Sequence, residues 1–537
     1  MFASRFAIIF GAARDFYICE IPAKQSLLRI PHSFRRYSCR APKAPVNRNL
    51  RAGEMDFSIQ GEQNAMGKTM TKRAKTMASC ALGALGAMLL CGAMAMAQDA
   101  AKAPPPTIAD AMKAAADAKS NGDTAWMLCA SAMVLFMTPG LAFFYGGLVR
   151  GKNVLNTLLM SYGAMAVLAV VWALVGYSIA FGNNNSPYFG GFEYLGLNGV
   201  SAFQPYPHTS IPQGVPHQVF MIFQMMFFII TPALISGSLV ERMKFSTFLV
   251  YITLWGLLVY CPVAHWVWYP LGWAYVAGAQ DFAGGSVVHI NAGFAALAAC
   301  LVLGPRKGYG KQPMLPHSLP LCLLGVGMLW FGWYGFNAGS AVASGSMATI
   351  AFVNTTLGAA GAMLAWMLLD QVTRKEMTAL GAGTGAVAGL VGITPACGYV
   401  TPMGALAVGM ITSAVCYLSA TLRAKSKLDD SLDAFAVHGV GGFTGAILTG
   451  VFSNTAAKTG GMNSAMVDGP LAGGGMGLVF TQFKVTATVA IYTFAMSFII
   501  CKVLQAVMGL RATEEQESRG LDLSLHGEEA YAEASSA

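Results

Sequence analysis

Hydrophobic residues gather in eleven long runs between residues 124 and 507, and short polar segments separate these runs. Each run holds about 20 residues, the length that an α-helix needs to cross the hydrocarbon core of a bilayer. The pattern therefore predicts an all-α polytopic membrane protein with eleven transmembrane helices. The predicted helices cover 124–146, 157–181, 218–240, 245–268, 286–304, 319–337, 348–369, 380–396, 403–422, 434–452 and 485–507.

Lys and Arg occur in alternate connections between the predicted helices. The connections after the first, third, fifth, seventh and ninth helices are basic, whereas those after the second, fourth, sixth and eighth contain no Lys or Arg. Because basic loops stay on the cytoplasmic side, the alternation predicts an extracytoplasmic N-terminus and a cytoplasmic C-terminus. The basic residues are Arg150, Lys152, Arg242, Lys244, Arg306, Lys307, Lys311, Arg374, Lys375, Arg423, Lys425 and Lys427.

Three segments precede the first predicted helix. Residues 66–97 have a basic start, an apolar middle and small residues before Ala97, as a bacterial signal peptide does. Residues 98–123 are then a short periplasmic lead. Residues 1–65 lack hydrophobic periodicity, so we expect an over-extended start or a disordered extension there, with a targeting segment as the alternative. The signal peptide agrees with the extracytoplasmic N-terminus and places the protein in the bacterial inner membrane.

Composition supports the membrane assignment and narrows the chemistry. Hydrophobic residues make up 55% of the chain and charged residues 11%, against about a quarter charged in soluble proteins. The net charge of +9 comes from residues 1–75, so it does not imply a nucleic-acid partner. The 11 cysteines show no metal-like spacing. We therefore predict no metal, no cofactor and no enzymatic site in a membrane domain at 124–508, which a cytoplasmic tail follows at 509–537.

A short repeat links the fifth and tenth predicted helices. Residues 288–294 read VHINAGF and residues 437–443 read VHGVGGF. Two five-helix units in succession insert with opposite polarity, which is the inverted-repeat plan of many transporters, with a shared site near the bilayer midplane. We therefore predict two inverted five-helix repeats followed by an eleventh helix.

The repeat places His289 and His438 opposite each other inside the membrane. An imidazole in hydrocarbon is costly unless it is hydrogen-bonded or faces a cavity. The two rings can bind each other and line a path, or they can form a buried pair that only holds helices together. A third reading makes them axial ligands of a haem. The aromatic and glycine-rich surroundings favour a small solute that arrives as a cation and crosses as a neutral molecule, such as ammonium or a methylamine.

Several longer motifs resemble the bacterial ammonium transporter family, whose fold the Rhesus glycoproteins share. They are FFYGGLVRGKNVLN at 143–156, DFAGGSVVHINA at 281–292, GWYGFNAGSA at 332–341, GLVGITPACGYV at 389–400 and DAFAVHGVGG at 433–442. The resemblance runs from about Thr124 to Tyr531. It implies a homotrimer with one pore of eleven helices in each subunit.

The resemblance also implies an outer site that recruits ammonium. Its matching residues are the cage aromatics Trp268 and Phe227 and the hydroxyl of Ser340. Asp281 matches a carboxylate that supports this site. From its position before a helix start, Asp281 is also expected to cap free N–H groups of that helix.

The pore below the outer site has four matching residues. Phe227 and Phe336 correspond to stacked phenylalanines that gate it, and His289 and His438 to its twin histidines. The segment between the cage tryptophan and Asp281 is one residue longer than expected.

Two aromatic residues, Tyr269 and Trp273, are the alternatives to Trp268 as the cage residue, because of that longer segment. The function implied is transport of ammonium. An ammonium sensor that signals through its tail is the main alternative.

The last residues, 509–531, resemble the cytoplasmic regulatory tail of the family. Gly509, Gly520 and Gly527 are expected to break any long helix there. The resemblance implies contacts with a neighbouring subunit and a docking surface for a PII-class nitrogen regulatory protein. A solvated tail is the simpler alternative.

Overall fold

The computed structural model describes residues 83, 86–88, 107–208, 214–455 and 466–531. The chain divides into two compact units, Met1–Pro105 and Pro106–Ala537, and the fold is that of the second unit. The predicted extension at 1–65 lies outside the described residues. So does the predicted signal peptide at 66–97, apart from 83 and 86–88.

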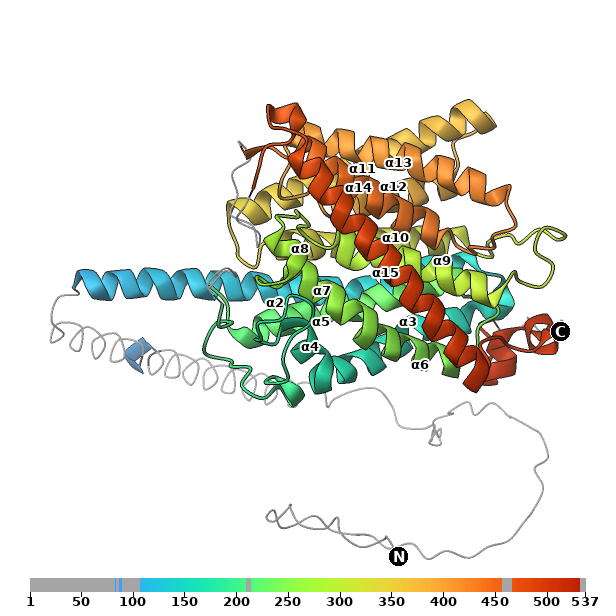
Figure 1. Ribbon diagram of the computed structural model, residues 1–537, viewed down its shortest axis with the longest axis horizontal. Helices are drawn as coiled ribbons and strands as arrows, with labels where there is room; N and C mark the ends of the chain where they lie inside the picture. The colour runs from blue at the N-terminus through green and yellow to red at the C-terminus, as the bar shows by residue number, and fades with distance from the viewer. Residues whose placement is uncertain (1–82, 84–85, 89–106, 209–213, 456–465, 532–537) are drawn as a thin grey trace, which may run out of the picture. The chain divides into compact units, whose positions relative to one another are not determined.

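The second unit is a bundle of helices (Figure 1), and its described residues contain no β-strand. Ten helical segments there are long and apolar enough to cross a membrane. These are Ile108–Leu148, Gly151–Phe181, His217–Ser238, Phe245–Val276, Gly285–Leu303, Leu319–Gly339, Ser346–Arg374, Pro402–Ala424, Phe435–Phe452 and Gly477–Val507. The prediction of an all-α polytopic membrane protein is confirmed.

The eighth predicted helix, 380–396, corresponds to the shorter apolar helix Ala379–Ile393, which has 15 residues. Its sequence is rich in glycine, and it ends where Thr394 and Pro395 begin a chain of turns. The other ten predicted helices coincide with the ten long segments. The count of eleven crossings therefore stays a prediction.

The individual helices keep the labels of Figure 1. The α-helices are α2 (Ile108–Leu148), α3 (Val154–Val171), α4 (Tyr177–Phe181), α5 (His217–Ile235), α6 (Phe245–Trp255), α7 (Cys261–Trp268), α8 (Trp273–Val276), α9 (Asn291–Leu303), α10 (Leu319–Gly339), α11 (Ser346–Arg374), α12 (Ala379–Ile393), α13 (Pro402–Ala424), α14 (Gly441–Phe452), α15 (Gly477–Val507) and α16 (Glu514–Arg519). The π-helical segments are η2 (Trp172–Gly176), η5 (Gly256–Tyr260), η6 (Gly285–Ile290), η7 (Phe435–Val440) and η10 (Asp522–His526).

Helix α2 begins well before the predicted first span. Thr107 caps it, and Thr107 and Asp110 form a capping box with each other's backbone N–H groups. The Ala-rich segment that follows favours helix. The part of the predicted lead from Ile108 onward is therefore continuous with the first span, and no helix boundary lies at 124.

Glycine lets pairs of helices pack closely in the bundle. A Cβ atom on Gly325 of α10 would lie 2.3 Å from the backbone nitrogen of Phe144 on α2. A Cβ atom on Gly409 of α13 would lie 2.0 Å from the carbonyl oxygen of Gly358 on α11. Such close backbone contact is typical of helices that pack in a membrane, where small residues replace the hydrophobic driving force.

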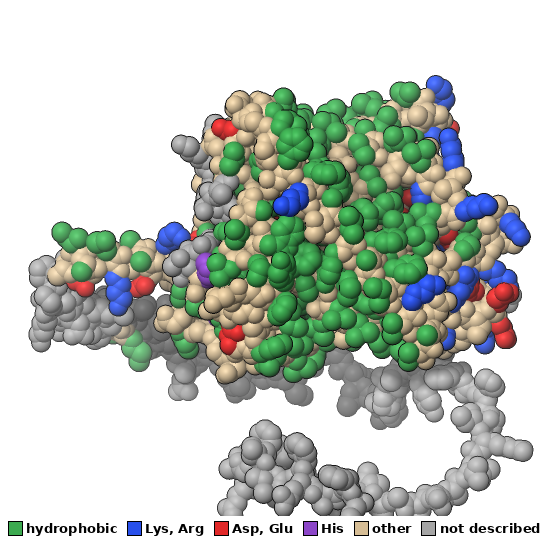
Figure 2. Space-filling model, viewed as in Figure 1, with side chains coloured by type: hydrophobic (Ala, Val, Ile, Leu, Met, Phe, Trp, Pro, Cys, Tyr) green, Lys and Arg blue, Asp and Glu red, His purple; other side chains and the backbone are tan. Residues whose placement is uncertain are grey.

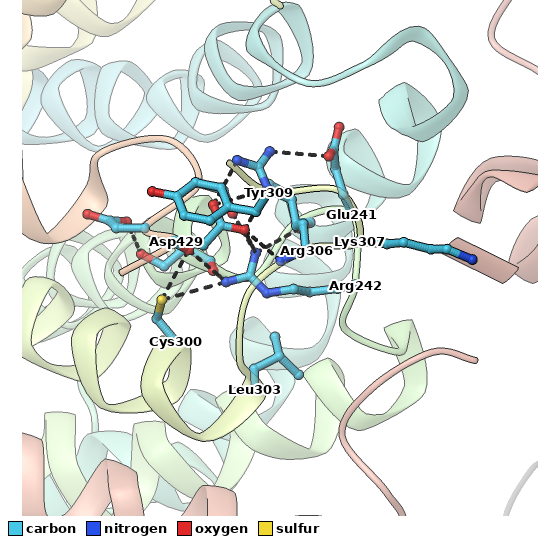
Figure 3. Close-up of polar contacts among 12 residues, drawn as sticks. Glu241, Arg242, Cys300, Leu303, Arg306, Lys307, Tyr309 and Asp429 are labelled. Atoms are coloured by element: carbon cyan, nitrogen blue, oxygen red, sulfur yellow. Dashed lines mark hydrogen bonds and ion pairs between the residues drawn. The ribbon is translucent and has the colours of Figure 1, made fainter. Parts of the chain in front are cut away.

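One end of the bundle carries the basic loops, and Figure 2 shows Lys and Arg side chains gathered there beyond a broad hydrophobic band. We call it the basic end. Charged side chains from separate loops form ion pairs and hydrogen bonds with one another at this end (Figure 3). Glu241 binds Arg306 at 3.2 Å, and Arg306 binds Asp429 at 2.8 Å. Glu241 also binds Arg150 at 2.7 Å. Arg242 donates to the carbonyl oxygen of Asp429 at 2.8 Å. These five residues form the loop ion cluster.

The C-terminal tail lies on the basic end. The Lys152 ammonium donates to the carbonyl oxygen of Glu517 at 2.9 Å, and the Asp522 carboxylate accepts the N–H of Asn156 at 2.7 Å. The three glycines predicted to break a long helix, Gly509, Gly520 and Gly527, have φ values of 71°, 109° and 70°. Only the short segments α16 and η10 form between them, in agreement with the prediction.

Candidate functional site

The two repeated histidines meet in the middle of the bundle. The Nδ1 atoms of His289 and His438 lie 3.3 Å apart, and the rings are stacked with centroids 5.3 Å apart. Both side chains are buried. At this distance one imidazole can donate to the other, which leaves the Nε2 atom of His289 without a partner. In this arrangement the two rings contact each other directly, which does not fit axial ligation of a haem iron from opposite faces.

Each histidine lies on a wide first turn that a carboxylate caps. His289 belongs to the π-helical segment η6 and His438 to η7. The Asp281 carboxylate accepts the backbone N–H groups of Gly284, Gly285, Ser286 and Val287 at 2.9, 2.6, 2.7 and 3.3 Å. The Asp430 carboxylate accepts those of Ala434, Phe435 and Ala436 at 3.1, 2.8 and 3.4 Å. The predicted capping role of Asp281 is therefore present, and Asp430 has the same role in the second half.

The glycines of the repeat bring the two histidine helices into contact. A Cβ atom on Gly293 would lie 2.1 Å from the backbone nitrogen of Gly439, beside His438. A Cβ atom on Gly442 would lie 2.8 Å from the Cβ atom of His289. The contact is reciprocal. Gly293, in the half that contains His289, packs beside His438, and Gly442, in the half that contains His438, packs on His289.

A narrow cavity of about 10 Å³ lies beside the histidine pair, with room for one molecule of the size of water. Apart from the two imidazoles its lining is apolar or aromatic. It consists of Met137, Leu141, Phe144, Ile230, Leu234, Val288, His289, Leu329, Trp333, Phe336, Val387 and His438.

A wider cavity of about 190 Å³ shares Phe144, Val387 and His438 with the narrow one and is more polar. Its lining includes Ser431 and Asp433. Burial raises the pKa of the Asp433 carboxyl above its ordinary range, although the Arg423 guanidinium opposes the shift. The histidine pair therefore stands between a narrow apolar space and a wider space with a carboxylate.

An aromatic wall lies on the other side of the narrow cavity. The rings of Phe227 and Phe336 are 4.4 Å apart, and the ring of Trp268 meets Phe227 edge-on at 5.5 Å. The indole N–H of Trp268 donates to the carbonyl oxygen of Asp281 at 3.1 Å. Ser340 is the residue directly after α10, and its hydroxyl donates to the carbonyl oxygen of Phe336 at 2.8 Å.

The structure thus brings the predicted cage and gate residues together in one place. All of them are buried. Burial raises the pKa of the Asp281 carboxyl, and the backbone N–H groups that it accepts oppose that shift.

The two alternative cage residues lie elsewhere. The ring of Tyr269 is stacked on His265 at 4.3 Å, and Trp273 packs beside Trp266 at 5.8 Å. Of the three candidates, Trp268 is the one whose ring contact with Phe227 the described structure contains.

Three residues of the site were not predicted as site residues. The ring of Trp333 is stacked on His289 at 5.5 Å, and its indole N–H donates to the Thr394 hydroxyl at 2.8 Å. Phe144 lines both cavities. Asp430 caps η7, and the sequence held a signal for it: the offset of 149 residues between His289 and His438 also separates Asp281 from Asp430.

Metal-ligating side chains do not cluster among the described residues of this site. Among the residues that the structure describes, no three His, Cys, Asp or Glu side chains cluster closely enough to bind one. The chemistry available is therefore hydrogen bonding by two imidazoles, an aromatic wall, and a carboxylate beyond each end of the pair.

Comparison with known proteins decides the family. A model of the Ammonium Transporter Family matches residues 125–531. This chain belongs to the ammonium transporter family. It is 46% identical over 411 residues to an ammonium transporter of Bacillus subtilis, covering 76% of this chain and 98% of that protein. It is 40% identical over 412 residues to the ammonium transporter Amt1 of Archaeoglobus fulgidus, covering 77% and 100%.

Solved structures of the family share this fold. The crystal structure of Saccharomyces cerevisiae Mep2 aligns with a TM-score of 0.68 at 33% identity, over 73% of this chain and 88% of that one. A structure described as a sensor Amt protein aligns with a TM-score of 0.68 at 28% identity, over 76% and 98%. The predicted family, the membrane fold and the assignment to transporters rather than enzymes are confirmed.

Proposed function

We propose that ammonium binds at the outer aromatic wall, loses its proton near the phenylalanine gate, and crosses as ammonia along the twin histidines. Trp268, Phe227 and Ser340 form the recruiting site, and Phe227 and Phe336 form the gate. The observation that carries the proposal is the narrow apolar cavity beside His289 and His438, which Phe336 lines while its ring contacts that of Phe227.

The energetics favour the neutral form inside the pore. A monovalent cation that enters an apolar space loses its hydration shell. The free-energy cost of this loss is far larger than the contacts in so small a space can offset. Ammonia can instead exchange hydrogen bonds with the unpartnered Nε2 atom of His289. At the outer wall the faces of Trp268 and Phe227 offer a cation about 1–2 kcal/mol of attraction. The released proton either stays outside or follows ammonia along the imidazole pair, and the two cases predict different currents.

The setting we propose is the bacterial inner membrane, with the N-terminus periplasmic and the C-terminus cytoplasmic. The gathering of Lys and Arg at the basic end supports this orientation. The proposed assembly is a homotrimer with one pore per subunit. Its cytoplasmic face carries the tail, and we propose that a PII-class regulatory protein docks there.

An ammonium sensor is the second candidate. The likeness to a structure described as a sensor Amt protein favours it, since the two chains align over 98% of that one. In a sensor the same wall binds ammonium, and the tail passes the signal on while little ammonium crosses.

Currents on a solid-supported membrane separate these functions. Liposomes with the purified protein receive a pulse of ammonium, for the wild type, His289→Ala and His438→Ala. His317→Ala is the matched control, because His317 binds Val149 and Tyr531 at the basic end. We expect a saturable current that both pore variants alter or abolish and the control retains.

Two other results have distinct meanings. A rapid internal pH change without a current indicates a neutral ammonia channel. The absence of both the current and the pH change, in a sample of folded trimers, contradicts transport and favours the sensor. Native mass spectrometry of the same sample tests the trimer, and co-purification with a PII protein, with and without residues 509–537, tests the docking.

A further inference from the structure

His265, on α7, has an unusual set of hydrogen-bond partners. Its Nδ1 atom lies 2.8 Å from the carbonyl oxygen of Ala180, and its Nε2 atom lies 3.0 Å from the carbonyl oxygen of Ser186. The side chain is buried. A carbonyl oxygen accepts a hydrogen bond and donates none, so each ring nitrogen faces a group that requires an N–H.

A neutral imidazole satisfies only one of these two carbonyls, because it carries one N–H and one lone pair. The doubly protonated imidazolium satisfies both. In the neutral form, the lone pair of one nitrogen would face a carbonyl oxygen at hydrogen-bond distance, which is repulsive. The geometry of His265 therefore fits the imidazolium form.

Burial disfavours the charged form of the His265 ring, whereas its hydrogen bonds to the carbonyl groups of Ser186 and Ala180 favour it. Two features of the surroundings act in the same direction as these hydrogen bonds. Ala180 lies in the last turn of α4, where the carbonyl groups of a helix carry partial negative charge and attract cations. Its neighbours in that turn are also bound from outside the helix: the carbonyl oxygen of Ile179 accepts from Gly190 and that of Phe181 from Tyr206. The face of the Tyr269 ring is stacked on the imidazole at 4.3 Å, as in cation–π contacts.

Other titratable groups lie on the elements around this histidine, but its ring nitrogens are bound to backbone carbonyl groups. Both hydrogen bonds of the His265 ring that the described structure contains go to the two carbonyl groups. The titratable side chains on the elements packed against α7, and in the segments that join them, are Tyr177 on α4, Tyr188, Glu193, Tyr194, Tyr206 and His208 in the connection before α5, Tyr260 on η5, Tyr269 after α7, Tyr275 on α8, Asp281 before η6, His289 on η6 and Tyr492 on α15.

His265 also stands one helical turn before Trp268, the last residue of α7. The segment after α4 that contains Ser186 also binds the next residue of α7, because the indole N–H of Trp266 donates to the carbonyl oxygen of Tyr188 at 2.8 Å. The Trp268 end of α7 is thereby fixed to the C-terminus of α4 and to the segment that follows it.

We propose that His265 acts as an imidazolium and is a positioning residue for the outer ammonium site, holding the Trp268 end of α7 in place. The link to ammonium rests on the proposed function, whereas the protonation state does not. Loss of the second proton breaks one hydrogen bond and loosens the wall that recruits the cation. Affinity for ammonium therefore falls as His265 deprotonates, while the pore itself is unchanged.

The first test is ¹⁵N NMR of histidine-labelled protein, with His265→Gln to assign the signal. At about pH 7.5, one unit above the ordinary histidine pKa of about 6.5, we expect both nitrogens of His265 to be protonated. A neutral tautomer at this pH overturns the proposal, whatever the protein transports. Thermal unfolding confirms that the variant is folded before the spectra are compared.

The second test separates affinity from turnover. We expect His265→Gln to raise the ammonium concentration at half-maximal current about tenfold, the effect of losing one charge-assisted hydrogen bond, with the maximal current kept. We take the ratio of this half-maximal concentration in the variant to that in the wild type at each pH. The ratio removes the effect of pH on the ammonia–ammonium equilibrium in solution, because both proteins experience the same equilibrium. This ratio should fall towards one as the pH rises through the titration that NMR records for His265. A ratio that stays constant across the pH range of this titration contradicts the positioning role. A loss of maximal current alone also contradicts it.

Discussion

Asp281 and Asp430 occupy equivalent places in the two halves of the protein. Each precedes its histidine by the same number of residues, and each carboxylate accepts several backbone N–H groups at the start of the histidine-bearing turn. Asp430 in addition accepts the hydroxyl hydrogen of Ser238. In each half, the carboxylate thus holds the turn that carries an imidazole.

The first prediction concerns Asp430, which the sequence analysis did not select. Asp430→Ala removes the acceptor for three backbone N–H groups, and we expect a loss of about 2 kcal/mol in stability. Asp430→Asn keeps one carbonyl oxygen and should lose about half as much. Thermal unfolding of the purified protein measures both. Equal stability of Asp430→Ala and the wild type would show that the cap contributes nothing.

The second prediction concerns the reciprocal glycines. Gly293→Ala places a Cβ atom 2.1 Å from the backbone of Gly439, so the two histidine helices must separate. We expect a loss of several kcal/mol in stability and loss of the ammonium current. Gly327→Ala is the matched control, because its Cβ atom would meet nothing within 4 Å. The control should be neutral or slightly stabilising. Similar effects from both substitutions would refute the close-contact explanation.

The third prediction separates the candidate cage residues. Trp268→Leu removes the indole that meets Phe227, and we expect the half-maximal ammonium concentration to rise about tenfold, equivalent to about 1.4 kcal/mol of cation–π attraction. Trp273→Leu should change it little, because Trp273 packs on Trp266. Concentration series of currents from liposomes measure both. A larger effect at Trp273 would move the cage to that residue.

The fourth prediction concerns pH and the loop ion cluster. Burial opposes ionisation of Asp429, but hydrogen bonds from Arg306 and the charges of Arg242 and Arg306 outweigh it, so the pKa of Asp429 lies below its ordinary value. The pKa of Glu241 is lowered in the same way, against burial, by Arg150 and Arg306.

A carboxyl with a lowered pKa contributes stability that is fully present above its unfolded pKa and is lost as the pH falls through the folded value. The wild type should therefore lose stability below about pH 4, near the ordinary pKa of a carboxyl. Asp429→Asn should be less stable by about 3 kcal/mol at neutral pH and show a smaller further fall in acid. Unfolding midpoints at a series of pH values test this. Parallel curves for the two proteins would exclude a role for Asp429 ionisation.

The helices were predictable because a membrane imposes a simple rule of length and polarity on the sequence. The run at 380–396 deviates, since α12 ends at Ile393 and the turns that follow are apolar as well. The predicted run extends past the end of α12 because hydrophobicity does not distinguish a helix from a buried turn.

The site was predictable where the sequence repeats itself. His289 and His438 were found from their shared motif, whereas Asp430 was missed, although the same offset of 149 residues separates it from Asp281. Contacts formed by tertiary packing had no such signal: the stacking of Trp333 on His289 depends on how α10 crosses η6. The partners of His265 are backbone carbonyl groups, which every residue has, so no sequence pattern could indicate them.

The reciprocal contact of the two halves has a consequence for synthesis of the protein. His289 precedes its partner by 149 residues. At about 5–20 residues per second, a ribosome needs roughly 10–30 seconds to make that stretch. During this time the first imidazole lacks the ring and the glycine that later cover it. Biogenesis must therefore shelter a half-built polar surface, through the insertion machinery, retained water or delayed entry of the fifth helix into lipid.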